Sequence, residues 1–140
     1  MKVTLHYRKG YKGQVDKTLE IQTPLRPAKD IETEYLLLVT TGLLTISKGY
    51  AYDFASGPTI DYPEWIRAAA LPHDALCQLF REGYLDADDR RTTDKWFRRI
   101  LKANGMNPIR REVWYRGVRL EAGTEAGPKE THMIDLEIPE

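Results

Sequence analysis

The sequence of 140 residues contains a single cysteine, Cys77. One cysteine cannot form a disulfide bond within the chain, and it cannot supply the cluster of thiolates that holds a structural zinc ion. A small scaffold stabilised by its own disulfides is therefore excluded. The composition suits a protein that folds in a reducing compartment.

Long hydrophobic runs are also absent. The most apolar stretches, at residues 36–39 and 68–71, are far shorter than the roughly 20 residues that a helix needs to cross a bilayer. The first residues, MKVTLHYRKGYKGQ, lack the apolar segment of a signal peptide. The sequence thus predicts neither a transmembrane protein nor secretion by the general pathway. A phosphate-binding glycine-rich loop, a G-x-S-x-G elbow and an H-E-x-x-H zinc motif are missing too.

The formal net charge is zero, but the charges are unevenly distributed. Residues 90–119 hold ten Lys and Arg against two acidic residues, whereas residues 121–140 hold six acidic residues against one Lys. A basic surface at Arg90–Arg119 could bind nucleic acid or anionic lipid. We favour the simpler interpretation, in which it is a solvated helix face that the acidic tail partly neutralises.

Alternating apolar and polar residues in the first half of the chain predict antiparallel strands. The clearest alternation is in Lys2–Arg8. Further strands are expected at Val15–Gln22, at Glu34–Thr40 and at Leu43–Lys48, the last two joined by a hairpin turn at Thr41-Gly42. The segment GYAYDFASGPTIDYP, residues 49–63, is long for a loop in a compact domain, and loops of this kind are often functional.

The second half predicts three helices. They are expected to run from near Pro63 to Gly83, from an N-cap at Asp86, Asp88 or Asp89 to Asn104-Gly105, and onward from Pro108. Within the first of them, a break or a restart is expected at Pro72, with Pro72 at the first helical position, because proline lacks the N–H that a helix interior needs.

We therefore predict an α+β fold in which a small N-terminal antiparallel sheet packs on a C-terminal three-helix unit that contains a helical hairpin. Residues 1–123 are expected to form a single domain. Residues 124–140 are an acidic tail, and the alternation at residues 132–139 predicts an edge strand within it. Such a strand would pair with the N-terminal sheet or with another molecule.

The inner faces of the predicted hairpin each carry one polar side chain. His73 lies in register with the apolar residues that follow it, and Asp94 lies in register with Phe97 and Leu101. His73 is ten residues before Gly83 and Asp94 is eleven after it, so the two side chains should lie side by side. An imidazole N–H that donates to the Asp94 carboxylate would leave the other ring nitrogen available as a base or a ligand.

Further polar residues are expected near this pair. Asp74 follows His73 directly, and Asp53 and Ser56 lie in the preceding loop. Together these groups could activate water, with or without a metal ion. A histidine–aspartate hydrogen bond that only braces two helices is the commoner situation, and we favour it over catalysis. A metal site with Asp74 and Asp53 as ligands is the least favoured interpretation.

Four segments between Gly49 and Gly123 carry a resemblance to a known family: YDFASGPTIDYP, AAALPHDALCQLFREG, RRTTDKWFRRILKANG and WYRGVRLEAG. In this order and at this spacing they resemble the domain-of-unknown-function 1353 family, which is found in tailed phages and prophages. The positions that match the family's motifs are Asp53, Ser56, Pro58, His73, Asp74, Asp94, Phe97 and Tyr115. Cys77 departs from the family pattern, which tends to have an aromatic residue there, usually tyrosine. If that phenol matters to an activity, this member has lost it.

The resemblance implies a phage-encoded accessory or virion-associated protein, found in the host cytoplasm or in the phage virion. Its partner would be a virion or host protein, or a second copy of the chain contacted through the C-terminal tail. The activity of the family is not settled, so the alternative to a binding scaffold is a small hydrolase.

A His-Asp helix that faces an aspartate on the next antiparallel helix is also similar to the arrangement in phospholipases A2. By that analogy His73 would be the general base, Asp74 a Ca²⁺ ligand and Asp94 the residue that orients His73. The sequence lacks the glycine-rich calcium loop and the disulfides of those enzymes. The analogy therefore concerns the arrangement of the helices alone.

Overall fold

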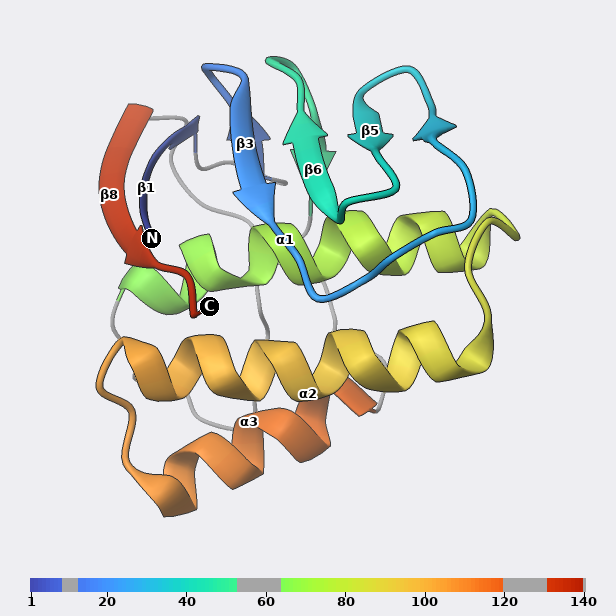
Figure 1. Ribbon diagram of the computed structural model, residues 1–140. Coiled ribbons are helices and arrows are strands. Elements are labelled where there is room, and N and C mark those ends of the chain that lie inside the picture. Colours follow the sequence, from blue (N-terminus) through green and yellow to red (C-terminus); the bar gives the residue numbers. More distant parts are fainter. Residues whose placement is uncertain (9–12, 53–63, 120–130, 140) are drawn as a thin grey trace.

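The computed structural model describes residues 1–8, 13–52, 64–119 and 131–139. Strands fill the first half and three helices follow, so the α+β class is confirmed (Figure 1). The strands are β1 (Lys2–Arg8), β2 (Gly13–Val15), β3 (Leu19–Gln22), β4 (Ile31–Glu32), β5 (Leu36–Leu38), β6 (Leu43–Ile46), β7 (Ala51–Tyr52) and β8 (Thr131–Glu137). The helices are α1 (Glu64–Arg81), α2 (Ala87–Ala103) and α3 (Pro108–Arg119).

The strands form two small antiparallel sheets. One has the order β7-β2-β1-β8 and the other the order β3-β6-β5-β4. The single strand expected at Val15–Gln22 is interrupted after Val15, so that its two halves, β2 and β3, belong to different sheets. In β3 the alternation places Leu19 and Ile21 in the core, whereas Glu20 between them is exposed. Each sheet thus offers one apolar face to the helices.

The C-terminal strand β8 completes the first sheet. It pairs with β1 along its whole length, from Lys2 opposite Glu137 to Arg8 opposite Thr131. It lies at the edge of the sheet, as the alternation at residues 132–139 predicts. The Asn104 side chain at the end of α2 accepts from the Glu137 amide and donates to its carbonyl, so one position of this edge is paired with a helix end.

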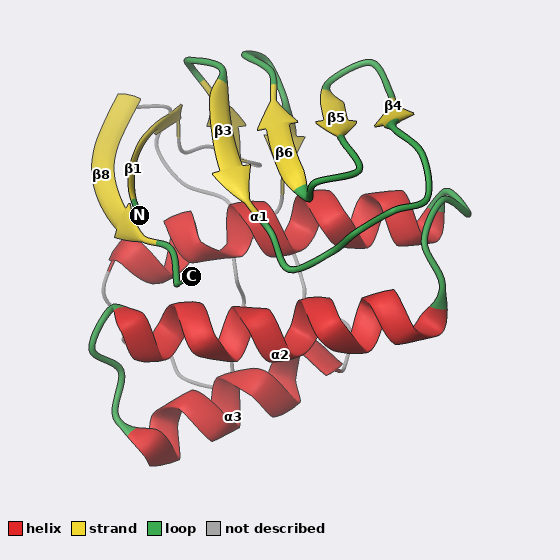
Figure 2. Cartoon of the chain, viewed as in Figure 1, coloured by secondary structure: helices red, strands yellow, loops and turns green. Residues whose placement is uncertain are grey.

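Helix α1 crosses the middle of the molecule, between the sheets and α2 (Figure 2). Four consecutive residues, Ala68–Leu71, are buried, as are most of the residues that follow up to Leu79. Helices that are apolar on every side are found in such central positions because both faces meet other elements. No helix in the described parts of the chain is long and apolar enough to cross a membrane.

The prediction of a break or a restart at Pro72 is wrong, because α1 is continuous from Glu64 to Arg81 with Pro72 inside it. A proline in a helix interior loses one backbone hydrogen bond and costs roughly 3 kcal/mol. Pro72 is buried, and the buried residues on both sides of it pack against the sheets and α2. We attribute the continuity of α1 to this burial, which offsets the local cost.

The turn between α1 and α2 follows the predicted signals. Gly83 adopts φ +86, the left-handed conformation that ends helices, and Tyr84 donates its amide to the Leu79 carbonyl. Asp86 is the N-cap of α2, and its side chain and that of Asp89 each accept a hydrogen bond from the other's backbone N–H. Helices α1 and α2 therefore form an antiparallel hairpin, and α3 packs on the outer side of α2 (Figure 1).

Candidate functional site

The helical hairpin brings His73 of α1 against Asp94 of α2. Nε2 of His73 lies 2.6 Å from Oδ1 of Asp94, a short charge-assisted hydrogen bond. Asp94 is fully buried and His73 is 6% exposed, so their hydrogen bond lies in the interior of the hairpin. The contact predicted from the similar sequence separations of His73 and Asp94 from Gly83, and from their positions on the inner helix faces, is thus present.

A third charged residue joins the pair. Nε of Arg90, one turn before Asp94 on α2, lies 3.2 Å from each of the two carboxylate oxygens. The Arg90 side chain is 25% exposed, and its guanidinium lies 5.8 Å from the ring centre of Phe80 on α1. An ionised carboxylate without partners would be very unfavourable at this depth. Arg90 and His73 together supply donors to both oxygens of Asp94.

Sequence reasoning missed Arg90. The signal was available, because Arg90 and Asp94 are four residues apart on a predicted helix, the spacing at which side chains of opposite charge meet. Arg90 was instead counted among the surface cations of residues 90–119. Its position one turn before a buried aspartate distinguishes it from those cations.

The surroundings of His73 change its pKa in two opposing ways. Burial alone lowers it, because an imidazolium is poorly solvated in the interior. Interactions with Asp74, Asp94 and Cys77 outweigh burial and place the pKa of His73 well above its ordinary value of 6.5. Of these contacts the one with Asp94 is the strongest hydrogen bond, since Oδ1 of Asp74 stands 3.9 Å from Nδ1. The raised pKa favours the imidazolium form of His73, in which Nε2 donates to Asp94.

The second ring nitrogen, Nδ1, faces Asp74. The Asp74 side chain is 29% exposed, whereas that of His73 is 8% exposed, so this side of the ring leads towards solvent. Tyr50 lies close enough for the charge of Asp74 to act on it: burial, and then the negative charge of Asp74, raise the pKa of Tyr50 above its usual range. The Tyr50 hydroxyl donates to Oε1 of Gln78, one turn after Asp74. Sequence reasoning gave no role to Tyr50 or Gln78.

Apolar groups complete the walls of the site. The Phe97 ring is centred 5.0 Å from the His73 ring and tilted by 43°. Sγ of Cys77 lies 3.6 Å from Nε2 and 3.8 Å from Nδ1 of His73. Cys77 thus packs beside the imidazole, one helical turn after His73. Tyr115, another family position, lies under Arg98 with its ring centre 4.3 Å from the guanidinium carbon.

The arrangement of these residues suits the hydrogen bonds described above better than it suits the binding of a metal ion. His73, Cys77 and Asp94 offer ligand atoms within 4.8 Å of one another, and nitrogen, sulfur and oxygen donors are a set that suits Zn²⁺. A cation at this position would have to break the 2.6 Å contact between His73 and Asp94, and Arg90 already holds a positive charge on the same carboxylate. Asp53, the expected second ligand beside Asp74, lies outside the described residues, as do Ser56 and Pro58.

The protein-family model described as Protein of unknown function (DUF1353) matches residues 31–118. This chain belongs to that family. The DUF1353 match covers more than half of the 140 residues and includes His73, Asp74, Arg90 and Asp94. No curated protein and no solved structure matches the chain. Since the DUF1353 description states no activity, the function has to be argued from the geometry of the site.

Proposed function

We propose that the chain is a phage-encoded accessory or virion-associated protein with hydrolase activity, in which His73 is the general base. The proposal of hydrolase activity rests on the different surroundings of the two ring nitrogens of His73. Nε2 is held by Asp94 at 2.6 Å, and Nδ1 faces the partly exposed Asp74. This is how a catalytic imidazole is oriented: one nitrogen is fixed by a carboxylate and the other is left for the reacting water.

The proposed step is water attack on a carbonyl group. Nδ1 takes a proton from a water molecule while the water oxygen bonds to the carbonyl carbon of an ester or amide. When the tetrahedral intermediate collapses, the same proton passes from Nδ1 to the leaving oxygen or nitrogen, and the base is regenerated. Asp94 stabilises the imidazolium that forms in between, and Arg90 keeps the Asp94 carboxylate ionised and in place.

The raised pKa of His73 gives this proposal a pH signature. Only the neutral imidazole can take a proton, so the active fraction of the protein grows as the pH rises towards the raised pKa of His73. Hydrolysis is therefore expected to increase on the alkaline side of neutrality. A site that only braces the helices would show no such profile.

The test is turnover by purified protein on aryl esters, phospholipid vesicles and aryl amides across this pH range. In His73→Gln the glutamine amide can still donate to Asp94, but no base remains. We expect a loss of about 10²–10⁴-fold in rate, the usual contribution of a general base. Asp88→Asn, an exposed change on α2, is the matched control and should leave the rate unchanged. No turnover by the wild type, or equal turnover by His73→Gln, would leave bracing as the role of the pair.

Ca²⁺ is the cofactor that the analogy with phospholipases A2 would supply, with Asp74 as one ligand. Thermal melting with and without Ca²⁺ tests this part, since a ligand that binds only the native state raises the midpoint. An Asp74→Asn variant that loses the shift would assign the ion to this carboxylate.

The phage part of the proposal is supported by the resemblance of Gly49–Gly123 to a family found in tailed phages and prophages. It is tested by mass spectrometry of purified virions and of lysates from cells that carry the gene. Peptides of the chain in virions would support a virion component. Peptides in the lysate alone would favour an accessory protein of the host cytoplasm.

A further inference from the structure

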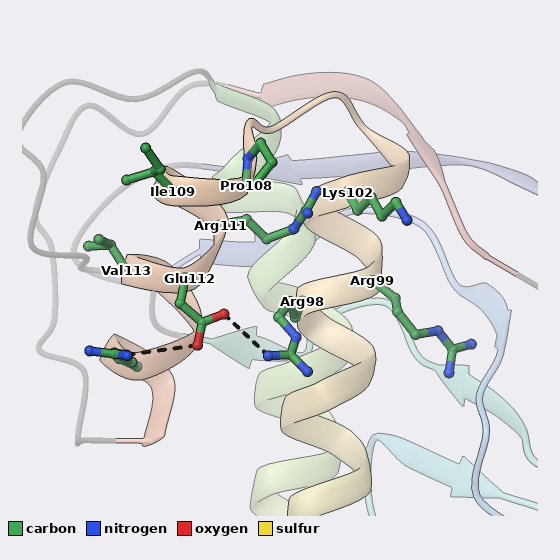
Figure 3. Close-up of a pocket in the computed structure, with 9 residues that line it drawn as sticks. Arg98, Arg99, Lys102, Pro108, Ile109, Arg111, Glu112 and Val113 are labelled. Carbon is green, nitrogen blue, oxygen red and sulfur yellow. Dashed lines mark hydrogen bonds and ion pairs between the residues drawn. The ribbon is translucent and has the colours of Figure 1, made fainter.

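Two surface features stand apart from the candidate site, and the first is a pocket between α2 and α3. It has a volume of about 740 Å³, and its lining includes four arginines. Glu112 in this lining lies 3.2 Å from Arg98 and 3.8 Å from Arg116 (Figure 3). Arg111 donates to the Met106 carbonyl. These contacts lie within the unit of α2 and α3, so the cations that make them need no outside partner to explain them.

The second feature is the outer edge of β8, the longest edge strand that the structure describes. Edge strands present a row of N–H and C=O groups, and monomeric proteins usually keep them short, bend them or cover them. The other edges follow this rule, because β4 and β7 have two residues each and β3 has four. β8 has seven residues and pairs with β1 along its whole length without a bulge. In Figure 1 it lies at the left margin of the molecule, with β1 on its inner side.

Alternate backbone groups of β8 face away from β1. Just after the strand, Ile138 exchanges two hydrogen bonds with the first residue of the chain. The backbone N–H and C=O of Glu137 bond instead to the Asn104 side chain. Because the direction of bonding alternates along an antiparallel strand, the backbone groups of Met133 and Asp135 point outward like those of Glu137. Within the described part of the chain, these outward groups of Met133 and Asp135 have no hydrogen-bond partner.

The side chains of β8 do not protect this edge. The Thr4 hydroxyl of β1 donates to the Asp135 carboxylate. Glu137 lies 3.8 Å from Nζ of Lys2, which is also on β1. Both carboxylates are therefore engaged on the side of β1. Met133, between them and the start of the strand, is 68% exposed and carries no charge.

We propose that two copies of the chain pair through β8, antiparallel and about a two-fold axis at Met133. Two-fold symmetry is the commonest arrangement of identical chains, and it requires a surface that is complementary to itself. In this register Met133 lies opposite Met133 of the second copy, and Asp135 lies opposite Thr131. No two like charges face each other, and two four-stranded sheets become one continuous sheet.

The neighbouring registers fit less well. An axis at Asp135 would set two carboxylates directly opposite each other, which is destabilising. An axis at Ile134 would set Met133 against a carboxylate and would need the backbone groups of Glu137, which Asn104 already bonds. The axis at Met133 avoids both conflicts. The proposal does not depend on hydrolysis.

Sedimentation equilibrium of the purified protein at rising concentration measures the association. The wild type is expected to dimerise and to dissociate on dilution, because one pair of short strands makes a small interface. Met133→Lys removes the apolar pair and sets two ammonium groups opposite each other, so the dimer should weaken about tenfold or more. Tyr84→Lys makes a similar change at an exposed aromatic residue between α1 and α2, and it should dimerise as the wild type does. A wild type that stays monomeric, or equal weakening in both variants, would overturn the proposal.

Disulfide crosslinking tests the register. Met133→Cys should give a covalent dimer under mild oxidation, because hydrogen-bonded residues opposite each other have Cα atoms about 5.5 Å apart, a span that suits a disulfide. Asp135→Cys is the matched control on the same strand. Its two copies would be roughly 14 Å apart in this register, beyond the roughly 7 Å that a disulfide can bridge. Cys77 is buried and is kept in both variants.

A covalent dimer of Met133→Cys alone supports the proposed axis. No covalent dimer of Met133→Cys, or equal crosslinking of Asp135→Cys, would overturn it. His73→Gln should dimerise as the wild type does, so failure of the hydrolase proposal and failure of this one can be told apart.

Discussion

Replacing Asp94 with asparagine removes one negative charge from the interior and leaves the shape of the side chain almost unchanged. In the wild type the carboxylate has two cationic partners, His73 at 2.6 Å and Arg90 at 3.2 Å. The neutral amide can still accept a hydrogen bond, but it no longer attracts either cation. The substitution therefore measures the charge of Asp94 with little change in packing.

The expected loss in the free energy of unfolding follows from these two interactions. A hydrogen bond to a charged group contributes about 1.5–3 kcal/mol, against about 0.5–1.5 kcal/mol for a neutral one, so each partner loses roughly 1 kcal/mol. The Arg90 side chain is 25% exposed and can be hydrated once its partner is neutral, which limits the loss. We expect Asp94→Asn to lower the free energy of unfolding by about 2 kcal/mol. Asp94→Ala, which leaves both cations without an acceptor, should lower it by about 3–5 kcal/mol.

Urea unfolding followed by circular dichroism at neutral pH measures both losses, provided that the m-values agree. Asp88→Asn is the control on the same helix, where the carboxylate is exposed and only favours the helix N-terminus. It should cost no more than about 1 kcal/mol. If Asp94→Asn were as stable as wild type, the buried network of His73, Asp94 and Arg90 would not be ionic, and the reasoning would fail.

Three further predictions concern the same hairpin. Because the pKa of folded His73 lies above its unfolded value, the stability that His73 contributes is fully present below pH about 6.5 and is lost as the pH rises through the folded pKa. The difference in unfolding free energy between wild type and His73→Gln should therefore shrink from pH 6 to alkaline pH in urea titrations, and a difference that grows would contradict the sign. Gly83→Ala should lower the free energy of unfolding by about 1 kcal/mol. The φ angle of Gly83 is +86 and an added Cβ would meet no other atom, so backbone strain is the only cost. A higher melting midpoint in calorimetry would count against this. Asp86→Ala should remove the capping box of α2 and cost about 1 kcal/mol, read from the same melts, and an unchanged midpoint would show that the cap is dispensable.

The helical hairpin is the part of the fold that the sequence predicts best. Its turn, its N-cap and the contact between His73 and Asp94 all depend on local signals: a left-handed glycine, a capping aspartate and the 3.6-residue period of two buried faces. Each of these signals acts within a few residues. Together they leave little freedom in how the two helices meet.

Other features depend on long-range packing that no local signal reports. The continuity of α1 through Pro72 requires the burial supplied by the sheets and α2, while the local preference at proline is for a break. The division of the strands into two sheets depends on which strands pair, because β2 pairs with β1 and β7 whereas β3 pairs with β6. Tyr50 approaches Asp74 and Gln78 only once the chain next to β7 is in contact with α1, so sequence spacing could not bring Tyr50 into the site.

The central claim is that Nε2 of His73 is held by Asp94 while Nδ1 is the nitrogen that exchanges its proton. Titration of the protein by nitrogen NMR with labelled histidine measures this directly, with His73→Gln used to assign the signal among His6, His73 and His132. The account predicts that Nδ1 loses its proton with a pKa above 6.5, that Nε2 stays protonated, and that Asp94→Asn lowers this pKa. Loss of the proton from Nε2, or a pKa at or below 6.5, would contradict it.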